Sequence, residues 1–318
     1  MRYGMTIPLD DVPLTEQAEV VRELAGSGYT DVWSSEAMGA DCFVPLAVAA
    51  AAEPTLRLGT AIAPAYTRGP ACLAQSAATL GATAPGRFLL GVGSSSQLIV
   101  EGWNDKPFDR PFHRTRDVVR FLRRAFAGER VDDRFETFTV HGFRLGIKVD
   151  PAPPILVAAL RSGMLTMAGA EADGAIINWL SASDVPQVVP LVHAGGPGKE
   201  IVARIMVMPT ADADAARAAG RRLVATYLNV PVYAEFHRWL GRSEDLAPMW
   251  RLWAEGNRRE AAASVPDRVV DALIIHGPPE SCREQIQAYV DQGVTTPVLS
   301  ILPTGEEPRS LARKLAPE

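Results

Sequence analysis

Residues 56–70 read LRLGTAIAPAYTRGP, and the ten residues that follow read ACLAQSAATL. The stretch begins like a buried strand, since Leu56, Leu58, Ala61 and Ile62 are apolar, and it ends in a turn rich in glycine and proline. Residues 71–80 then have the pattern of a helix. A strand, a loop and a helix in direct succession form the building unit of α/β proteins with parallel sheets.

The same alternation continues along the chain. Strands are expected at 2–7, 31–35, from 56 onward, and at 88–92, 155–158, 174–178, 203–208 and 296–302. Helices are expected at 14–27, 45–52, 71–80, 114–126, 163–172, 211–227 and 280–292. Eight strands linked through helices favour a parallel (β/α)8 TIM barrel over a doubly wound sheet.

Two insertions are expected in this barrel. One follows strand four, where residues 128–150 read as a hairpin, and one follows strand seven, where residues 228–265 are polar, helical and rich in tryptophan. A chain of 318 residues fits one such barrel, so residues 1–318 are expected to form a single domain.

Composition narrows the class of protein. The chain is 47% hydrophobic, enough for a large core, and its net charge of −5 argues against a nucleic-acid partner. No apolar run reaches the roughly 18 residues that a membrane span needs, and the strand-like start leaves no room for a signal peptide. The three cysteines fit buried thiols better than disulfides or a metal site. We expect a soluble, cytoplasmic protein.

Chemistry in such a barrel is expected where the strands end on the carboxyl side. This rule selects residues 34–36, 61–64, 93–96, 159–163 and 178–179. Arg161, Ser162 and Gly163 open a helix there, and free amides plus a guanidinium would hold a phosphate; the plainer alternative is an ordinary helix cap. The five histidines lack ligand spacing, so no metal site is expected.

Several motifs resemble the bacterial luciferase-like family of flavin and deazaflavin enzymes, and within it the coenzyme F420 branch that includes methylene-tetrahydromethanopterin reductase. They are the opening stretch together with GRFLLGVG (86–93), VEGW (100–103), RTRD (114–117), ADG (172–174), SVPD (264–267) and IHGPPE (275–280). The resemblance covers nearly the whole chain and implies an oxidoreductase that transfers a hydride between coenzyme F420 and a small organic substrate.

The resemblance also assigns roles to residues. It implies a cis peptide bond at Ala61–Ile62 against the cofactor ring. The cofactor-binding set is Thr60, Ala61, Ile62, Gly93, Ser95, Arg161, Ser162 and Gly163, and the catalytic candidates are Glu36, Ser94 and Glu101. For Glu36 the alternative is a salt bridge at the barrel rim, and for the glycines and serines it is an ordinary tight turn.

Two departures from the resemblance bear on mechanism. Glu36 is followed by Ala37, where alcohol and sugar-phosphate dehydrogenases of the family have a histidine base, and Ser94 stands where the sugar-phosphate enzymes have a glutamate. Without that base an alcohol has no evident proton acceptor, so we expect hydride delivery to an activated C=C or C=N bond. Two alternatives stay open: a monooxygenase dependent on FMN, and a flavin- or deazaflavin-binding protein without catalysis.

The expected partners are few. The resemblance implies a homodimer through helices beside strands two and three, where residues 47–52 and 74–78 are rich in alanine and permit close packing. A separate flavin or F420 reductase would be needed if the flavin alternative holds.

Overall fold

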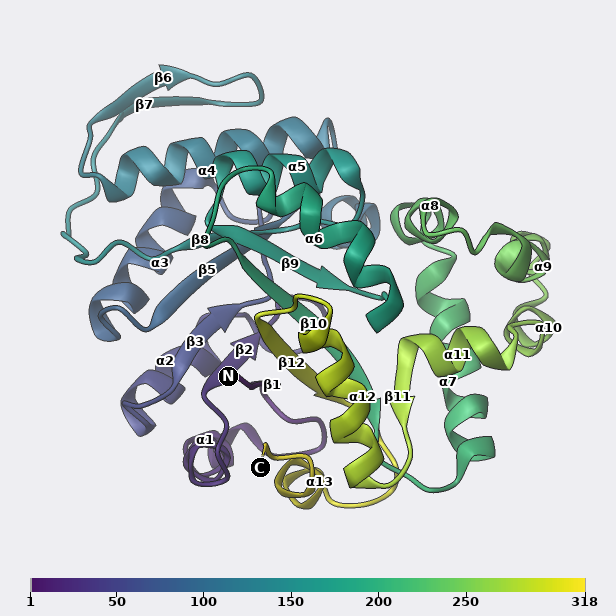
Figure 1. The fold of residues 1–318 in the computed structure, drawn as a ribbon. Coiled ribbons are helices and arrows are strands. Elements are labelled where there is room, and N and C mark those ends of the chain that lie inside the picture. The colour runs from purple at the N-terminus through teal and green to yellow at the C-terminus, as the bar shows by residue number, and fades with distance from the viewer. Residues whose placement is uncertain (1, 318) are drawn as a thin grey trace.

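The computed structural model describes residues 2–317, and its centre is a closed ring of parallel strands (Figure 1). Hydrogen bonding follows the order β10-β12-β1-β2-β3-β5-β8-β9, and β9 pairs with β10 to close the ring. The strands are β1 (Gly4–Thr6), β2 (Asp31–Ser34), β3 (Arg57–Thr60), β5 (Phe88–Gly93), β8 (Ile155–Ala158), β9 (Gly174–Asn178), β10 (Glu200–Met208) and β12 (Thr296–Ile301). This confirms the (β/α)8 TIM barrel.

Helices surround the strands because each has an apolar stripe that packs on the sheet. In α4 (Pro111–Phe126), for example, Val118, Val119 and Leu122 are buried while the arginines of the other face are not. The helices between consecutive barrel strands are α1 (Gln17–Gly26), α2 (Val44–Ala52), α3 (Pro70–Thr83), α4 (Pro111–Phe126), α5 (Ser162–Glu171), α6 (Val185–His193), α7 (Ala213–Leu228) and α12 (Pro279–Asp291). The last helix, α13 (Pro308–Lys314), is fixed to α1 by Arg309, which contacts Glu16 and Glu23.

Both expected insertions are present. A two-stranded antiparallel hairpin, β6 (Val131–Arg134) and β7 (Thr139–Phe143), lies between α4 and β8. After β10, the helices α8 (Pro231–Trp239), α9 (Ser243–Ala254) and α10 (Arg258–Ala263) project to one side of the barrel (Figure 1). The sequence did not reveal α11 (Asp267–Leu273), α13 or the short strands β4 (Ala63–Pro64) and β11 (Ile274–His276).

The barrel interior is layered because side chains alternate along each strand. The middle layer is apolar and consists of Trp33, Leu89, Leu156, Ile176, Val202 and Val298. Two residues before these positions, at the amino ends of the strands, three of the six residues are charged: Asp31, Arg87 and Glu200. Two residues after them, at the carboxyl ends, lie the small or polar residues Ser35, Gly91, Ala158, Asn178, Arg204 and Ser300. The layers therefore differ in chemistry from one end of the barrel to the other.

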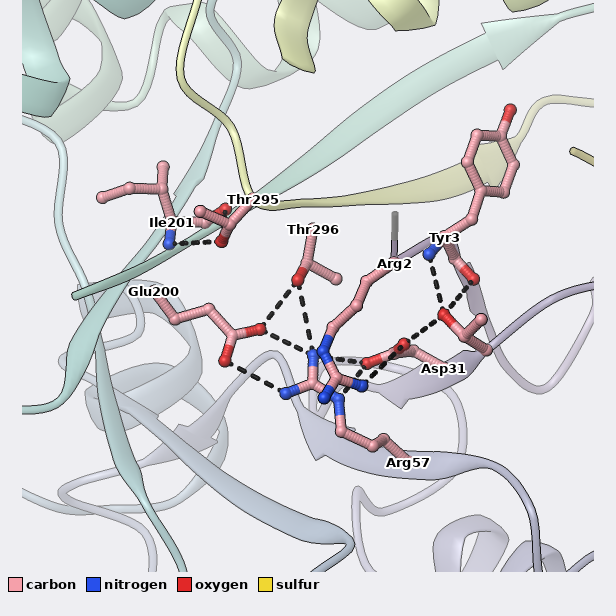
Figure 2. Close-up of polar contacts among 9 residues, drawn as sticks. Arg2, Tyr3, Asp31, Arg57, Glu200, Ile201, Thr295 and Thr296 are labelled. Carbon is pink, nitrogen blue, oxygen red and sulfur yellow. Dashed lines mark hydrogen bonds and ion pairs between the residues drawn. The ribbon is translucent and has the colours of Figure 1, made fainter. Parts of the chain in front are cut away.

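The amino-terminal end is closed by a network of ion pairs (Figure 2). Arg57 donates to Asp31 at 2.6 Å and to both oxygens of Glu200, at 2.6 and 3.1 Å. Thr296 donates to Glu200 at 2.7 Å, so three strands besides β3 are tied to one guanidinium. Asp31 is fully buried, and its charge is tolerated because it is paired. This end of the barrel serves stability.

None of the helices within residues 2–317 is long and apolar enough to cross a membrane. The cysteines are unpaired; Cys42 and Cys282 are buried as expected, but Cys72 is exposed. The dimerisation surface needs a similar correction. Ala74, Ala77 and Ala78 pack inside the chain's own core, so of the two segments expected to form this surface, 47–52 and 74–78, the first presents alanines outward.

Candidate active site

A cavity of about 670 Å³ lies at the carboxyl ends of four of the eight barrel strands. Its lining comes from the ends of β1, β2, β10 and β12, together with residues 37–40 and the segment that leads into α13. Thr6, Ser35, Arg204 and Ser300 are the polar barrel residues in this lining. The cavity is therefore at the end of the barrel where the sequence predicted chemistry.

One side of the barrel mouth is a wall with little side-chain volume. The peptide bond Ala61–Ile62 is cis, as the resemblance implied. A Cβ on Gly93 would lie 2.9 Å from the Cβ of Ala158 and 3.1 Å from Cγ1 of Ile62, so glycine at this buried position lets both side chains pack directly against β5. The amide of Glu36 donates to the carbonyl of Ile62 at 3.3 Å, which ties the wall to the loop after β2.

Thr60 has a structural role beside this wall. Its buried hydroxyl donates to the carbonyl of Gly91 and accepts from the amide of Gly91, both at 2.8 Å. A Cβ on Gly91 would lie 1.9 Å from the carbonyl oxygen of Thr60, so the two strands approach as closely as glycine permits. The hydroxyl of Thr60 is thereby committed to the barrel.

Ser94 and Ser95 follow the wall at the end of β5. Ser95 has a φ of 63°, a left-handed conformation that is uncommon outside glycine, and both serines are half-buried. The Ser94 hydroxyl is 3.4 Å from the carbonyl oxygen of Ser95, a weak contact that leaves it available to a ligand. The turn has the backbone of a binding loop.

Glu36 is held in an ion pair at the rim. Arg68 donates to its Oε2 at 2.8 Å, and the Thr67 hydroxyl lies 3.3 Å from Oε1. Arg68 in turn lies over the ring of Phe43, 5.0 Å from its centroid. The Glu36 carboxylate therefore has the geometry of the rim salt bridge that was its alternative interpretation, adjacent to the wall.

Glu101 lies farther out, on a π-helical segment, Leu98–Trp103. Its carboxylate accepts from the Gln97 side chain at 2.6 Å and from the amide of Phe108 at 3.1 Å, and these hydrogen bonds lower its pKa. The residue is exposed and orders the loop before α4. It does not line the cavity.

Arg161, Ser162 and Gly163 are at the start of α5, as expected. Arg161 is the residue that precedes the helix, and its guanidinium is 3.8 Å from the carboxylate of Glu235 on α8. Its side chain is 47% exposed, and Ser162 and Gly163 are exposed. The first-turn amides of a helix have no partner within the helix, so this end can receive an anion.

Arg204 is the residue that sequence reasoning missed. It lies on β10, where it is in register with Asn178 of β9, and it donates to the Ser300 hydroxyl at 2.8 Å. Its Nε is buried and has no hydrogen-bond partner among residues 2–317. The signal was present as a single charged residue within the run IVARIMVM (201–208), which otherwise reads as core.

Aromatic side chains lie beside Arg204. Trp179, which has a φ of 54°, packs against Tyr227 of α7 with ring centroids 4.9 Å apart. The side-chain amide nitrogen of Asn178 lies 3.4 Å from the hydroxyl oxygen of Tyr233 on α8. The tryptophans of the insertion pack elsewhere: Arg238 lies over Trp250, Arg258 over Trp253, and Trp239 stacks on Phe236. The tyrosines, and not these tryptophans, approach the barrel mouth.

These features fit a bound planar cofactor with an anionic tail. Gly93 lets Ile62 and Ala158 pack closely at the wall, the start of α5 offers amides and a guanidinium, and the Nε of Arg204 is an unused donor. Thr6 also has a buried hydroxyl without a partner in residues 2–317. Buried donors of this kind are normally satisfied, so a ligand group is expected at the mouth.

Comparison with known proteins gives a consistent result. A Mycobacterium tuberculosis protein that bears the name of a coenzyme F420-dependent oxidoreductase is 28% identical over 332 residues, covering 94% of each chain. The 5,10-methylenetetrahydromethanopterin reductase of Archaeoglobus fulgidus is 27% identical over 310 residues, covering 93% of this chain and 92% of the relative.

Among solved structures, the coenzyme F420-dependent tetrahydromethanopterin reductase of Methanopyrus kandleri has the same fold. The TM-score is 0.79 at 21% identity, with 99% of this chain and 97% of the other covered. The sequence model of the luciferase-like monooxygenase family matches residues 1–296. The chain therefore belongs to the luciferase-like monooxygenase family.

Proposed function

We propose that this protein is a coenzyme F420-dependent oxidoreductase that moves a hydride between the deazaflavin and a small organic substrate. The observation that carries the proposal is the wall formed by Ala61, Ile62 and Gly93 at the same end of the barrel as the cavity, tied by the hydrogen bond from Glu36 to Ile62 to the loop whose residues Ser35 and Ala37 line that cavity. The similarity to relatives named as F420-dependent enzymes supports the choice of cofactor.

The residues divide the cofactor's contacts between them. The backbone of Ala61 and Ile62, with Gly93 behind it, would support the ring, and Ser95 borders this surface. Arg161, with the amides of Ser162 and Gly163, would hold the phosphate, favoured by the helix dipole and by charge-assisted hydrogen bonds. When bound, the deazaflavin supplies hydride transfer at its carbon 5.

The finer proposal is reduction of an activated C=C or C=N bond. Two features support it: no histidine lines the cavity within residues 2–317, and Glu36 is engaged by Arg68. An alcohol substrate would have to lose its proton to a base, and the carboxylates in this lining, Asp10, Asp11, Glu306 and Glu307, are all solvent-exposed. An activated double bond needs a positioned acceptor and a proton, which a water held by Ser94 can deliver.

The test is binding of oxidised F420 and of oxidised FMN, followed by the fluorescence of each cofactor. We expect F420 to bind the wild type and Arg161→Ala to weaken it about tenfold, which corresponds to about 1.4 kcal/mol. Arg238→Ala is the matched control, because Arg238 also pairs with Glu235 and has a similarly exposed side chain. Its affinity should equal that of the wild type.

Other outcomes would contradict the proposal in different ways. Equal affinity of both variants would place the phosphate away from α5. Binding of FMN alone would favour the monooxygenase alternative, with a separate reductase as partner. Binding of F420 without oxidation of its reduced form by any enone, imine or quinone would favour a binding protein without catalysis. Activity with alcohols would overturn the finer proposal alone.

A further inference from the structure

We propose that the substrate carries a carboxylate and that Arg204 binds it in the cavity at the barrel mouth. This inference rests on the proposed function, because it names the class of substrate that the same site accepts.

The first step is the position of the guanidinium. Arg204 lines the 670 Å³ cavity, and its only side-chain hydrogen bond within residues 2–317 is to the hydroxyl of Ser300. Its Nε is buried without a partner. A guanidinium that lines the cavity therefore keeps unused donors, in the planar arrangement that matches the two oxygens of a carboxylate.

The second step is charge. Among residues 2–317, no carboxylate lies within ion-pair distance of Arg204, and only Asp10 among the carboxylates acts on its charge from farther away. At the other end of the barrel, by contrast, Asp31 and Glu200 are paired directly with Arg57. Holding a cation in a partly desolvated cavity without a counter-charge is unfavourable. A ligand anion would supply the missing charge, and its binding would be strengthened by the low polarity of Leu9, Ile301 and Leu302 around it.

The third step selects the kind of anion. Arg204 is the only basic residue that the described cavity lining contains, and Asp10, Asp11, Glu306 and Glu307 stand around its entrance. Glu306 contacts Lys314, and Glu307 caps α13, but Asp10 and Asp11 have no ion pair within residues 2–317. An acidic entrance with a single cation inside disfavours a phosphate dianion more than a carboxylate, which carries one charge.

Neutral donors complete the site. The Thr6 hydroxyl has no partner within residues 2–317, and Ser300 can donate its own proton while it accepts from Arg204. Asn178 is the neighbour of Arg204 across the strand pair and contacts Tyr233. These groups would surround a carboxylate without adding charge.

The experiment compares carboxylates with their neutral amides. Acetate, crotonate and cinnamate, each beside its amide, and inorganic phosphate are titrated into the F420-loaded and the cofactor-free protein, with calorimetry and ligand-observed NMR as readouts. We expect at least one acid to bind the wild type tenfold or more tightly than its amide. Arg204→Gln should abolish that difference, and Arg204→Lys should retain part of it.

Arg222→Gln is the matched control, since Arg222 is exposed on α7 and the substitution removes the same charge. Its preference for the acid should equal that of the wild type. Thermal unfolding of each variant shows whether it is folded. If Arg204→Gln does not fold, Arg204→Lys still tests the role of the guanidinium.

The outcomes separate this inference from the proposed function. Equal binding of every acid and its amide, or tighter binding of phosphate, overturns the carboxylate site even if F420 binds. A tenfold loss of F420 affinity in Arg204→Gln, with no acid preference in the wild type, assigns Arg204 to the cofactor. A preference for acids that depends on Arg204 in a protein that does not bind F420 would support the anion site and refute the proposed function.

Discussion

Glu200 and Arg204 lie on the same strand, β10, and both point into the barrel, yet only Glu200 has a counter-charge. Arg57 binds Glu200 at 2.6 Å, while the partner of Arg204 among residues 2–317 is a neutral hydroxyl. The paired charge is at the amino end of the barrel and the unpaired one at the carboxyl end, where barrel enzymes have their active sites. We infer from this difference that the amino end of the barrel stabilises the fold and that the carboxyl end binds ligands.

Arg57→Leu should destabilise the protein by about 3–5 kcal/mol, because it leaves Asp31 and Glu200 without their cation. Burial alone would raise the pKa of Glu200, but the hydrogen bond and charge of Arg57 outweigh it and lower that pKa. Urea unfolding measures the loss. Arg124→Leu, which removes exposed pairs with Glu129 and Asp133, is the control and should cost less than about 1 kcal/mol. Similar losses in both variants would contradict the assignment.

Arg204→Met should change the free energy of unfolding in the opposite direction to Arg57→Leu. It should stabilise the protein by about 1–3 kcal/mol and weaken binding of the substrate carboxylate. Burial lowers the pKa of Arg204, which shows that its charged form is disfavoured there, although an arginine remains charged at neutral pH. Calorimetric unfolding of wild type and variant in ligand-free buffer gives the answer. A lower melting temperature would mean that Arg204 stabilises the barrel.

His237 should make stability depend on pH. It is fully buried, and burial first, with the charge of Arg242 second, lowers its pKa to about 3. The unfolded chain binds the proton near pH 6.5, so stability is complete above that value and falls as the pH drops from 6.5 toward 3. Between pH 7.5 and pH 5, His237 should lower the free energy of unfolding by about 2 kcal/mol.

The comparison for this prediction uses urea unfolding at both pH values. His237→Gln should remove the pH-dependent part, and His193→Gln, at an exposed position, should leave it intact. The carboxylate of Asp184 pairs with Arg242 beside the imidazole in wild type and variant alike, so the difference between the two proteins isolates the part of His237. An unchanged slope in His237→Gln would exclude His237 as its source.

Gly93→Val should weaken F420 binding more than tenfold, because the new side chain would occupy the wall beside Ala158 and Ile62. Gly146→Val is the control, since a Cβ at Gly146 meets no other atom within 4 Å. Fluorescence titration gives the affinities, and thermal unfolding shows how much of the effect is structural. Normal affinity in Gly93→Val would place the ring elsewhere.

The sequence predicted the barrel because the periodic signals agreed with one another: β8 and β9 have the expected bounds, and both insertions are where composition indicated. It located the wall at residues 61 and 62 through resemblance, which periodicity alone could not do. Arg204 was missed because what distinguishes it is the lack of an ion-pair partner among residues 2–317. Which side chains pair depends on which strands become neighbours, and the sequence does not show that directly. Glu36 was hard to interpret for the same reason. Its ion-pair partner, Arg68, is 32 residues away in the sequence, and β3 lies between them.

The homodimer remains a prediction, and the outer face of α2 is where we expect it. Val44 is 61% and Val48 37% exposed, Ala47 and Ala51 lie beside them, and the helix has no charged residue. An apolar helix face of this kind marks an interaction surface more often than free solvent-exposed protein. Two copies packed through it should bury on the order of 1,600 Å² or more in total.

Sedimentation at micromolar concentration should show a dimer for the wild type and a monomer for Val48→Glu, because the new carboxylates would be desolvated in the interface. Ile147→Glu, at an exposed apolar residue far from α2 in sequence, is the control and should remain dimeric. A monomeric wild type, or a dimer unaffected by Val48→Glu, would move the interface away from α2 or remove it.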